Sequence, residues 1–515
     1  MTTSADRHLE RIARGGALSI AGAGVSAIAG FVVTAVITNA YDKETAGVLF
    51  SATSLYLVLV ALGGLGIEVG LGRFVPQLVV AGRWAAIRIC LTWTAVAALV
   101  SSVLIAVGVW IWAEPIAAAM SLPADSGPLV LRILATTVPP TSLGLWALGA
   151  TRAFANIRQT VWFDKIFRSV AQLVLVVWCA VAAGSVVFLT LAWVIPSVLF
   201  APLAIIAMVR LVRRRAEPVA DEPTSAGVMG QFWSFTWPRS VAMVSQVVIQ
   251  RADIIIIAAL ISPAAAAVYT AATRFVPLGQ LGVQAIQQVI QPRFTHLLAT
   301  GERAALDEVF RTTTAWSMAM AWPLYLVIAG VPSLYLSLFG EGFDDEGVAV
   351  VLVMAVAMLI GVASGPIDTL LLMSGRSGLS LVNSLAALTV DLGLCLVLIP
   401  QIGILGAAVA WCVAVAVRAL LGCLQVWRQL RISPLSRESL VVAVTAIGCF
   451  AAPLAVASVF TDSMVMRIVL MVVGAAAYGL VLWRNRRRLR LAALRSLMPG
   501  GRRRPDGNSV DRPSD

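Results

Sequence analysis

The sequence predicts an all-α polytopic membrane protein, and three observations support this fold class. Hydrophobic residues make up 59% of the 515 residues and charged residues only 12%, whereas a soluble protein carries about 25% charged residues. Apolar stretches of membrane-spanning length, about 17–25 residues, recur from one end of the chain to the other. The connections between these stretches are short, so no soluble domain fits between them.

Fourteen apolar segments are predicted to be transmembrane helices. The first is too long for the apolar part of a signal peptide and leads directly into the second, so we interpret it as a retained helix. In order, the segments are residues 16–40, 46–70, 85–112, 128–150, 163–183, 186–209, 232–260, 266–290, 310–337, 347–373, 378–399, 403–427, 437–459 and 464–483.

The distribution of arginine predicts the orientation of these helices. Arginine is concentrated at both ends of the chain and in every second loop, for example in RLVRRR at Arg210–Arg215, whereas the opposite loops carry acidic residues and Lys43. Because an excess of Lys and Arg marks cytoplasmic loops, both termini are predicted to be cytoplasmic. Topology and attraction to anionic membrane lipids then explain the net charge of +12, without binding of nucleic acid.

The sequence also matches itself at an offset of 220 residues. GVLFSATSL (Gly47–Leu55) aligns with AVYTAATRF (Ala267–Phe275), and Arg73 falls on Arg293 in the same register. Each repeat holds six predicted helices, an even number, so the two copies have the same orientation. This predicts two six-helix lobes related by a pseudo-two-fold axis along the membrane normal, with a cavity between them and a C-terminal helix pair appended.

These patterns divide the chain into six predicted regions. The two lobes are joined by a basic linker, and the basic tail, rich in Pro and Gly, is predicted to be disordered. The regions are a cytoplasmic N-terminus (1–15), an N-lobe with helices 1–6 (16–209), the cytoplasmic linker (210–231), a C-lobe with helices 7–12 (232–430), helices 13 and 14 (431–483) and the cytoplasmic tail (484–515).

The composition disfavours an enzyme. His8 and His296 are the only histidines, so no histidine-based triad or metal cluster can be assembled, and we expect neither a metal nor a cofactor. The six cysteines lie in or beside predicted spans without metal-ligand spacing and are interpreted as small apolar residues. Many helices without a soluble catalytic part are typical of a transporter.

Three stretches resemble a known family. They are DIIIIAALISPAAAAVYTAATRF (253–275), the opening of the chain with Gly47, Gly66 and Arg73 as landmarks, and LIPQIGILGAAVAW (398–411). Together they are similar to the polysaccharide-type flippases, in the superfamily that also holds multidrug and toxin extrusion transporters and lipid II flippases. The resemblance covers about residues 10–430.

The resemblance implies a function in cell-surface polysaccharide biosynthesis. Such flippases move an undecaprenyl-pyrophosphate-linked oligosaccharide from the cytoplasmic to the outer leaflet of the plasma (inner) membrane by alternating access. It also implies membrane lipids, a polysaccharide polymerase and glycosyltransferases as partners. A drug/cation antiporter of the same fold, a lipid II flippase and a non-transporting scaffold for polymer synthases remain alternatives.

Four arginines are the candidates for binding the pyrophosphate in a cationic cavity. A charge inside the membrane costs from about 2.5 to more than 10 kcal/mol, so an arginine retained there needs an anion or water, and its planar fork suits phosphate. Arg251 and Arg274 are the leading candidates, with Arg239 near the cytoplasmic end of its helix and Arg132 in the other lobe. Arg418 is instead expected to extend to the cytoplasmic face.

Four acidic residues are candidates for ion coupling or ion pairs. Asp253 and Arg274 are predicted at the same depth on adjacent antiparallel helices, where an ion pair is one interpretation. Asp391 is the deepest acid and the best candidate for coupling to Na⁺ or protons, the alternative being a salt bridge or hydrogen-bonded helix contact. Asp368 and Glu68 lie late in their spans.

The predicted topology can be tested by labelling with a membrane-impermeant maleimide. Asp344→Cys is expected to react in intact cells and Arg213→Cys only after the membrane is opened, because these positions lie in loops of opposite charge. The wild-type protein measures labelling of the native cysteines. Reaction of Arg213→Cys from outside would contradict the orientation.

Overall fold

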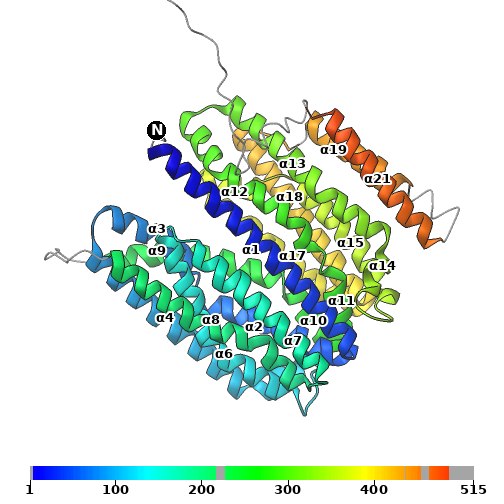
Figure 1. The fold of residues 1–515 in the computed structure, drawn as a ribbon, viewed down its shortest axis with the longest axis horizontal. Helices are drawn as coiled ribbons and strands as arrows, with labels where there is room; N and C mark the ends of the chain where they lie inside the picture. The colour runs from blue at the N-terminus through cyan, green and yellow to red at the C-terminus, as the bar shows by residue number, and fades with distance from the viewer. Residues whose placement is uncertain (1–3, 216–226, 435, 454–462, 487–515) are drawn as a thin grey trace, which may run out of the picture.

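The computed structural model describes residues 4–215, 227–434, 436–453 and 463–486, and within these ranges every regular element is a helix (Figure 1). The predicted all-α fold is therefore confirmed. Three predicted features lie wholly or partly outside the described residues. They are the linker at 216–226, predicted span 13 at 454–462 and the tail from residue 487 onward.

The first half of the chain contains nine helical elements. One of them, η1, is a π-helix in which the segment DKIFR continues directly into α7. The elements are α1 (Ser4–Ala40), α2 (Lys43–Gly63), α3 (Ile67–Val80), α4 (Trp84–Ile111), α5 (Ala113–Ala119), α6 (Gly127–Ala153), η1 (Thr160–Arg168), α7 (Ser169–Val181) and α8 (Val186–Arg215).

The second half follows the same order with more interruptions. It consists of α9 (Val228–Ile249), α10 (Ala252–Leu260), α11 (Pro263–Thr273), α12 (Val276–Thr300), α13 (Arg303–Gly330), α14 (Pro332–Ser337), α15 (Asp344–Ala363), α16 (Ile367–Met373), α17 (Ser377–Ile402) and α18 (Ile404–Leu430), and then α19 (Arg437–Ala446), η2 (Ile447–Ala451) and α21 (Met464–Arg484).

The element boundaries recur at the offset found in the sequence. α1 ends at Ala40 and α10 at Leu260, and α2 begins at Lys43 and α11 at Pro263, each 220 residues apart. α4 and α13 are both 28 residues long and each is followed by a short helix, α5 or α14. The two halves therefore share one architecture, whereas the lobe boundaries remain a prediction.

Helices long and apolar enough to cross a membrane number nine in the described ranges. α9 and α10 are long and apolar enough when taken together, with a bend of 46° at their junction, and make the number ten if the pair is counted as one span. Four predicted spans do not meet this criterion. The fifth contains charged residues in its π-helix, and the eighth is broken between α11 and α12. Polar and aromatic residues of α13 lower the mean hydropathy of the ninth. The thirteenth is only partly described.

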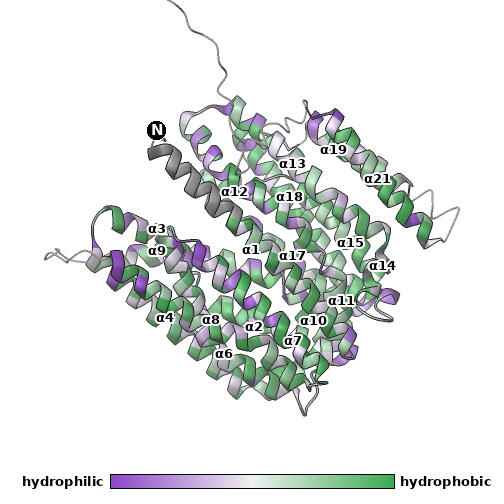
Figure 2. Ribbon diagram, viewed as in Figure 1, coloured by the Kyte–Doolittle hydropathy of each residue, from purple (hydrophilic) through white to green (hydrophobic). Residues whose placement is uncertain are grey.

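The outer surface of the helices is apolar, as expected for a multi-pass membrane protein. Figure 2 shows hydrophobic residues along the length of most helices, with hydrophilic residues gathered mainly toward helix ends. Large apolar side chains such as Leu104, Trp178 and Leu480 are exposed on this surface, and in a bilayer they face lipid. α19 and α21 lie at the edge of the bundle beside α13 (Figure 1), where the Tyr478 hydroxyl donates to the carbonyl of Ala319 at 3.2 Å.

The two halves touch at the start of α2 and α11. A Cβ added at Gly47 would lie 1.7 Å from the carbonyl oxygen of Pro263, so the backbones are in direct contact there. Asp42 caps α2, and hydrogen bonds from the backbone and then the hydroxyl of Thr45 hold the pKa of Asp42 below its usual value. The charged cap thereby fixes the start of α2 at this contact.

Polar bonds tie the same end of the molecule together. The Asn39 side-chain amide donates to the carbonyl of Leu338 at 2.8 Å, and the Lys43 ammonium donates to that of Gly342 at 2.7 Å. Beneath these bonds lies one apolar core that joins α1 and α2 of the first half to α10, α11, α14 and α15 of the second.

A second contact between the halves lies at the junction of α2 and α3. The Ser240 hydroxyl of α9 donates to the carbonyl of Leu65 at 2.5 Å, and Gly66 has a left-handed backbone with φ +60°. A Cβ at Gly66 would lie 2.3 Å from that hydroxyl oxygen. Glycine is therefore needed both for the turn and for the approach of α9.

The contact at Gly47 can be tested by adding one methyl group. Gly47→Ala forces α2 and α11 apart and is expected to destabilise the protein by about 1–3 kcal/mol, as overpacking does in other cores. Thermal unfolding in detergent measures the loss. Gly72→Ala is the control, because nothing lies within 4 Å of a Cβ at that exposed position of α3. Equal melting temperatures for both variants would contradict the close approach.

Candidate functional site

The candidate site lies where two neighbouring helices are interrupted. α9 ends at Ile249, and α10 starts at Ala252 after a turn at Gln250 and Arg251. Arg251 has φ −133° and ψ −24°, outside the helical range, and its position just before α10 places it at the positive end of that helix dipole. Interrupted helices of this kind line ligand sites inside membrane transporters.

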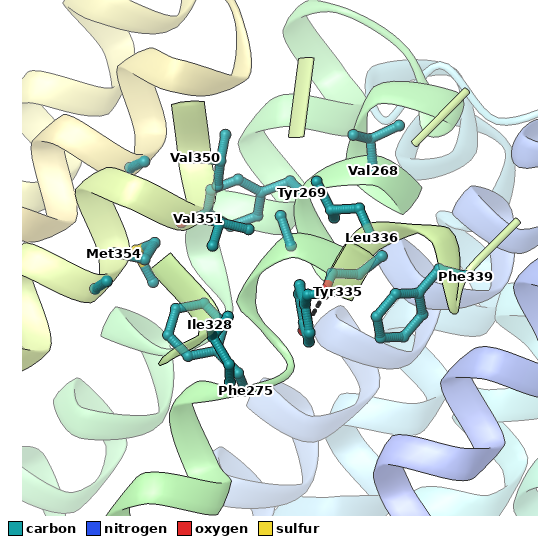
Figure 3. Packing of buried hydrophobic residues seen from close by; sticks show 14 of the residues in the cluster. Val268, Tyr269, Phe275, Ile328, Tyr335, Leu336, Phe339, Val350, Val351 and Met354 are labelled. Carbon is teal, nitrogen blue, oxygen red and sulfur yellow. Dashed lines mark hydrogen bonds between the residues drawn. The ribbon is translucent and has the colours of Figure 1, made fainter. Parts of the chain in front are cut away.

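The second interruption separates α11 from α12 at Arg274 and Phe275. Pro277 follows directly and has no N–H to continue the helix. Tyrosines add hydrogen bonds at this break. Tyr335 donates to the carbonyl of Ala271 at 2.8 Å, which also accepts from the N–H of Arg274, and Tyr325 donates to the carbonyl of Val276 at 3.1 Å. Figure 3 shows Tyr335 and Phe275 packed at this break, with ring centroids 5.7 Å apart.

The two interruptions bring Arg251 and Arg274 together. The two guanidinium groups lie close enough to repel each other electrostatically, and in the described part of the chain neither forms an ion pair. Nε of Arg274 is buried without a hydrogen-bond partner, and its guanidinium lies 5.9 Å from the ring centre of Phe50. Two neighbouring cations without an acidic partner form a site suited to an anion.

The predicted ion pair between Asp253 and Arg274 is wrong. Asp253 instead accepts a 2.5 Å hydrogen bond from the Tyr269 hydroxyl and a 2.8 Å bond from the N–H of Ile254. Tyr269 and Arg274 are five residues apart, which on a helix points them in different directions. Asp253 and Arg251 attract each other electrostatically, beyond ion-pair distance.

Asp391 is a buried acid without an ion-pair partner in the described part of the chain. It is fully buried on α17, and neither carboxylate oxygen has a hydrogen-bond partner among the described residues. Asp253 and Tyr269 both lie close enough to Asp391 to interact electrostatically with its carboxyl group. The predicted salt bridge of Asp391 is therefore not formed, and Asp253, Tyr269 and Asp391 make one buried cluster across α10, α11 and α17.

Asp368 forms an ion pair with Arg418. The distance is 2.8 Å, and Arg418 also donates to the side chain of Gln246 at 2.7 Å. Ser380 adds a 3.3 Å hydrogen bond to the same carboxylate. The guanidinium of Arg418 therefore has partners on two neighbouring helices, and its extension to the cytoplasmic face stays a prediction.

Two further candidates lie away from the paired arginines. Glu68 of α3 forms an ion pair with Arg152 of α6, inside the first half of the chain. Arg132 forms an exposed ion pair with Glu114 at 3.1 Å and lies 5.2 Å from the Trp110 ring centre. The structure gives both residues local partners and does not bring them to the helix breaks.

Arg239 belongs to a third arrangement, which spans the two halves. Its guanidinium lies 3.7 Å from the ring centre of Phe235, and that of Arg73 lies 4.1 Å from the same ring. The two cations also repel each other electrostatically. Arg73 and the tyrosines at the helix break, Tyr325 and Tyr335, were not predicted from the sequence as site residues. The repeat had aligned Arg73 with Arg293, but no spacing in the sequence connects the tyrosines to the breaks.

The fold is similar to that of solved transporters of the MOP superfamily. Lipid II flippase MurJ in an inward closed conformation superposes with a TM-score of 0.69 at 12% identity, over 90% of this chain and 97% of MurJ. An inward-facing multidrug resistance MATE transporter gives 0.65 at 13% identity, over 79% and 94%. A MOP superfamily transporter from Pyrococcus furiosus Vc1 gives 0.55 at 15%, over 82% and 95%. At these identities the similarity shows the fold alone.

The sequence identifies the family more closely. A family profile described as "Polysaccharide biosynthesis protein" matches residues 77–345, just over half of the chain. The protein therefore belongs to this polysaccharide biosynthesis family. A comparison with curated proteins gives no significant match.

The bond between Tyr269 and Asp253 provides a test of the buried cluster. Tyr269→Phe is expected to lower the free energy of unfolding by about 1.5–3 kcal/mol, because a hydrogen bond to a charged group is lost. Tyr56→Phe is the control, since it removes a buried 2.8 Å bond to the neutral hydroxyl of Thr141 and is expected to cost only about 0.5–1.5 kcal/mol. Thermal unfolding measures both, and equal losses would show that Asp253 carries no charge.

Proposed function

We propose that the protein is a flippase for cell-surface polysaccharide biosynthesis. It moves an undecaprenyl-pyrophosphate-linked oligosaccharide from the cytoplasmic to the outer leaflet of the plasma membrane, with both termini in the cytoplasm. Membership of the polysaccharide biosynthesis family and the MOP fold support this proposal. Assembly enzymes such as a polymerase then polymerise or attach the glycan outside, and glycosyltransferases are further partners in this proposal.

One observation carries the proposal, the pairing of Arg251 with Arg274 at the two helix breaks. The pyrophosphate of a lipid-linked glycan carries about two negative charges, and these must cross the apolar interior together with the sugars. Two guanidinium groups that repel each other are stabilised when that anion binds between them, and arginine offers the bidentate geometry that phosphate prefers. The N-terminus of α10 beside Arg251 adds a positive dipole.

Arg73 and Arg239 form a second cationic position on the same route. They lie on α3 and α9, one in each half of the chain, at the end that the arginine distribution predicts to be cytoplasmic. We assign them to the first contact with the pyrophosphate. Because Arg73 and Arg239 lie in different halves, movement of one half relative to the other during alternating access changes the distance between them.

The buried acids supply the coupling in this proposal. Asp391 and Asp253 lie near each other without a cationic ion-pair partner within the described ranges, so uptake of a proton or Na⁺ relieves their repulsion. Because Asp253 also attracts Arg251, cation uptake frees Arg251 for the pyrophosphate. Coupling and substrate binding are thereby linked through one residue.

The same acids support an alternative function, a drug/cation antiporter. The unpartnered carboxylate of Asp391 would attract a cationic substrate, whereas the arginine pair would repel one. A lipid II flippase shares the pyrophosphate chemistry and differs only in the glycan, so the arginine pair fits both cargoes.

Replacement of Arg251 tests the flippase proposal. Arg251→Ala is expected to reduce surface polysaccharide by ten-fold or more, since a lost charge-assisted contact costs about 1.5–3 kcal/mol. Arg251→Lys is expected to retain part of the export, because charge remains without the bidentate fork. Surface polymer and membrane abundance of the protein are measured in the same cells.

Arg311→Ala is the matched control. Arg311 forms a 2.9 Å ion pair with Asp307 one turn away on α13, and pairs of this type contribute little. Normal export is expected from this variant. Full export by an abundant Arg251→Ala protein would refute the phosphate-binding role, and loss of the protein itself would assign Arg251 to folding instead.

A further inference from the structure

A cavity of about 470 Å³ lies within the second half of the chain, beside the arginine site. α9, α12, α13, α15, α16, α17 and α18 all contribute to its wall. Its volume falls in the range of about 300–1,000 Å³ that is common for small-ligand sites. Neither Arg251 nor Arg274 lines it, so it is distinct from the cationic site.

Glutamines dominate the polar part of the wall. Gln280, Gln284 and Gln287 follow one another at helical spacing on α12, and Gln246 of α9 and Gln250 of the following turn also line the cavity. The amides of Gln250, Gln284 and Gln287 form no side-chain hydrogen bond within the described part of the chain, and Gln280 makes only a 4.0 Å contact to a thioether. Most of these amides are therefore free to bind a ligand in the cavity.

Two buried polar atoms at the wall also lack partners. Ser317 is only 2% exposed, and its buried hydroxyl forms no hydrogen bond in the described residues, although a serine within a helix can usually bond to a carbonyl of the preceding turn. Nε of Arg418 is buried and unpaired as well. An unsatisfied buried polar group costs about 1–3 kcal/mol, and a ligand with hydroxyl groups in the cavity would remove this cost.

The charges of the wall cancel. Asp368 and Arg418 are its charged side chains, and they form an ion pair with each other at 2.8 Å. The cavity therefore holds no unpaired charge to select a cation or an anion. Glutamine amides both donate and accept hydrogen bonds, as sugar hydroxyls do, and Trp411 adds an aromatic wall against which the apolar face of a sugar ring can lie.

We propose that this glutamine cavity binds neutral sugar residues of the transported glycan. The inference rests on the proposed flippase function and deepens it, because it assigns the glycan and the pyrophosphate to separate positions. Gln250 connects the two, since it lines the cavity and is adjacent in sequence to Arg251 at the same helix break. A pyrophosphate between the arginines thus places the first sugars at the mouth of the cavity.

Binding of neutral sugars to the full-length protein in lipid nanodiscs tests this assignment. The probes are the methyl glycosides of glucose, galactose, mannose, rhamnose and N-acetylglucosamine, measured by calorimetry, with inorganic pyrophosphate measured separately. Saturable binding of at least one glycoside is expected. In the double variant Gln284→Leu/Gln287→Leu its affinity is expected to fall about ten-fold or more, because the hydrogen bonds of two amides are lost, whereas pyrophosphate binding stays unchanged.

The adjacent glutamine provides a matched control. Gln288 is exposed on α12 and does not line the cavity, so Gln288→Leu is expected to leave the binding of both probes unchanged. Ser317→Ala provides a second test with minimal change in volume and is expected to weaken the glycoside but not pyrophosphate.

The outcomes separate this inference from the flippase proposal. No saturable binding of any glycoside, equal binding by Gln284→Leu/Gln287→Leu and wild type, or tighter binding of tetraphenylphosphonium than of every sugar would overturn the sugar site. If the wild-type protein does not bind pyrophosphate, that result would instead count against the arginine site and the proposed function.

Discussion

The lack of water inside the bilayer is the constraint on which this structure depends. Every interruption of a membrane helix leaves backbone groups without partners, and each must be satisfied within the protein. Here the carbonyl of Ala271 accepts from the N–H of Arg274 and from the Tyr335 hydroxyl, and Tyr325 donates to the carbonyl of Val276 at the same break. Glycine lets neighbouring backbones approach. The breaks can therefore persist at the centre of the bundle, where they place polar side chains that an unbroken helix would not.

The fold was predictable because hydropathy and repetition act over long stretches. Segment lengths and the 220-residue repeat anticipated the order of elements, including boundaries at Ala40 and Leu260. The number of spans was less accessible, because a helix break and polar residues lower the mean hydropathy of the segments formed by α11, α12 and α13. Such departures from ideal apolarity are concentrated in the second half, which also holds the candidate site.

The site was only partly predictable. Sequence depth placed Asp253 and Asp391 correctly in the buried interior and Arg251, which is half-buried, beside Asp253. The partner of each residue, however, depends on the direction of its side chain. A turn of two residues at Gln250 changes the phase of α10 relative to α9, so simple counting from the loop paired Asp253 with Arg274 instead of Tyr269. The glutamine spacing on α12 is visible in the sequence, yet its meaning depends on the cavity wall formed by α9 and α18.

The apolar core shared by α1, α2 and the helices of the second half has a thermodynamic consequence. If the halves separate at this end, apolar surface of that core becomes exposed to water, and exposure of such surface raises the heat capacity. The hydrogen bonds of Asn39 and Lys43 add little to this cost, because water replaces them. The free-energy difference between the closed form and a form open at this end should therefore follow a curve with temperature. The growth temperature then sets what fraction of the molecules is in the open form.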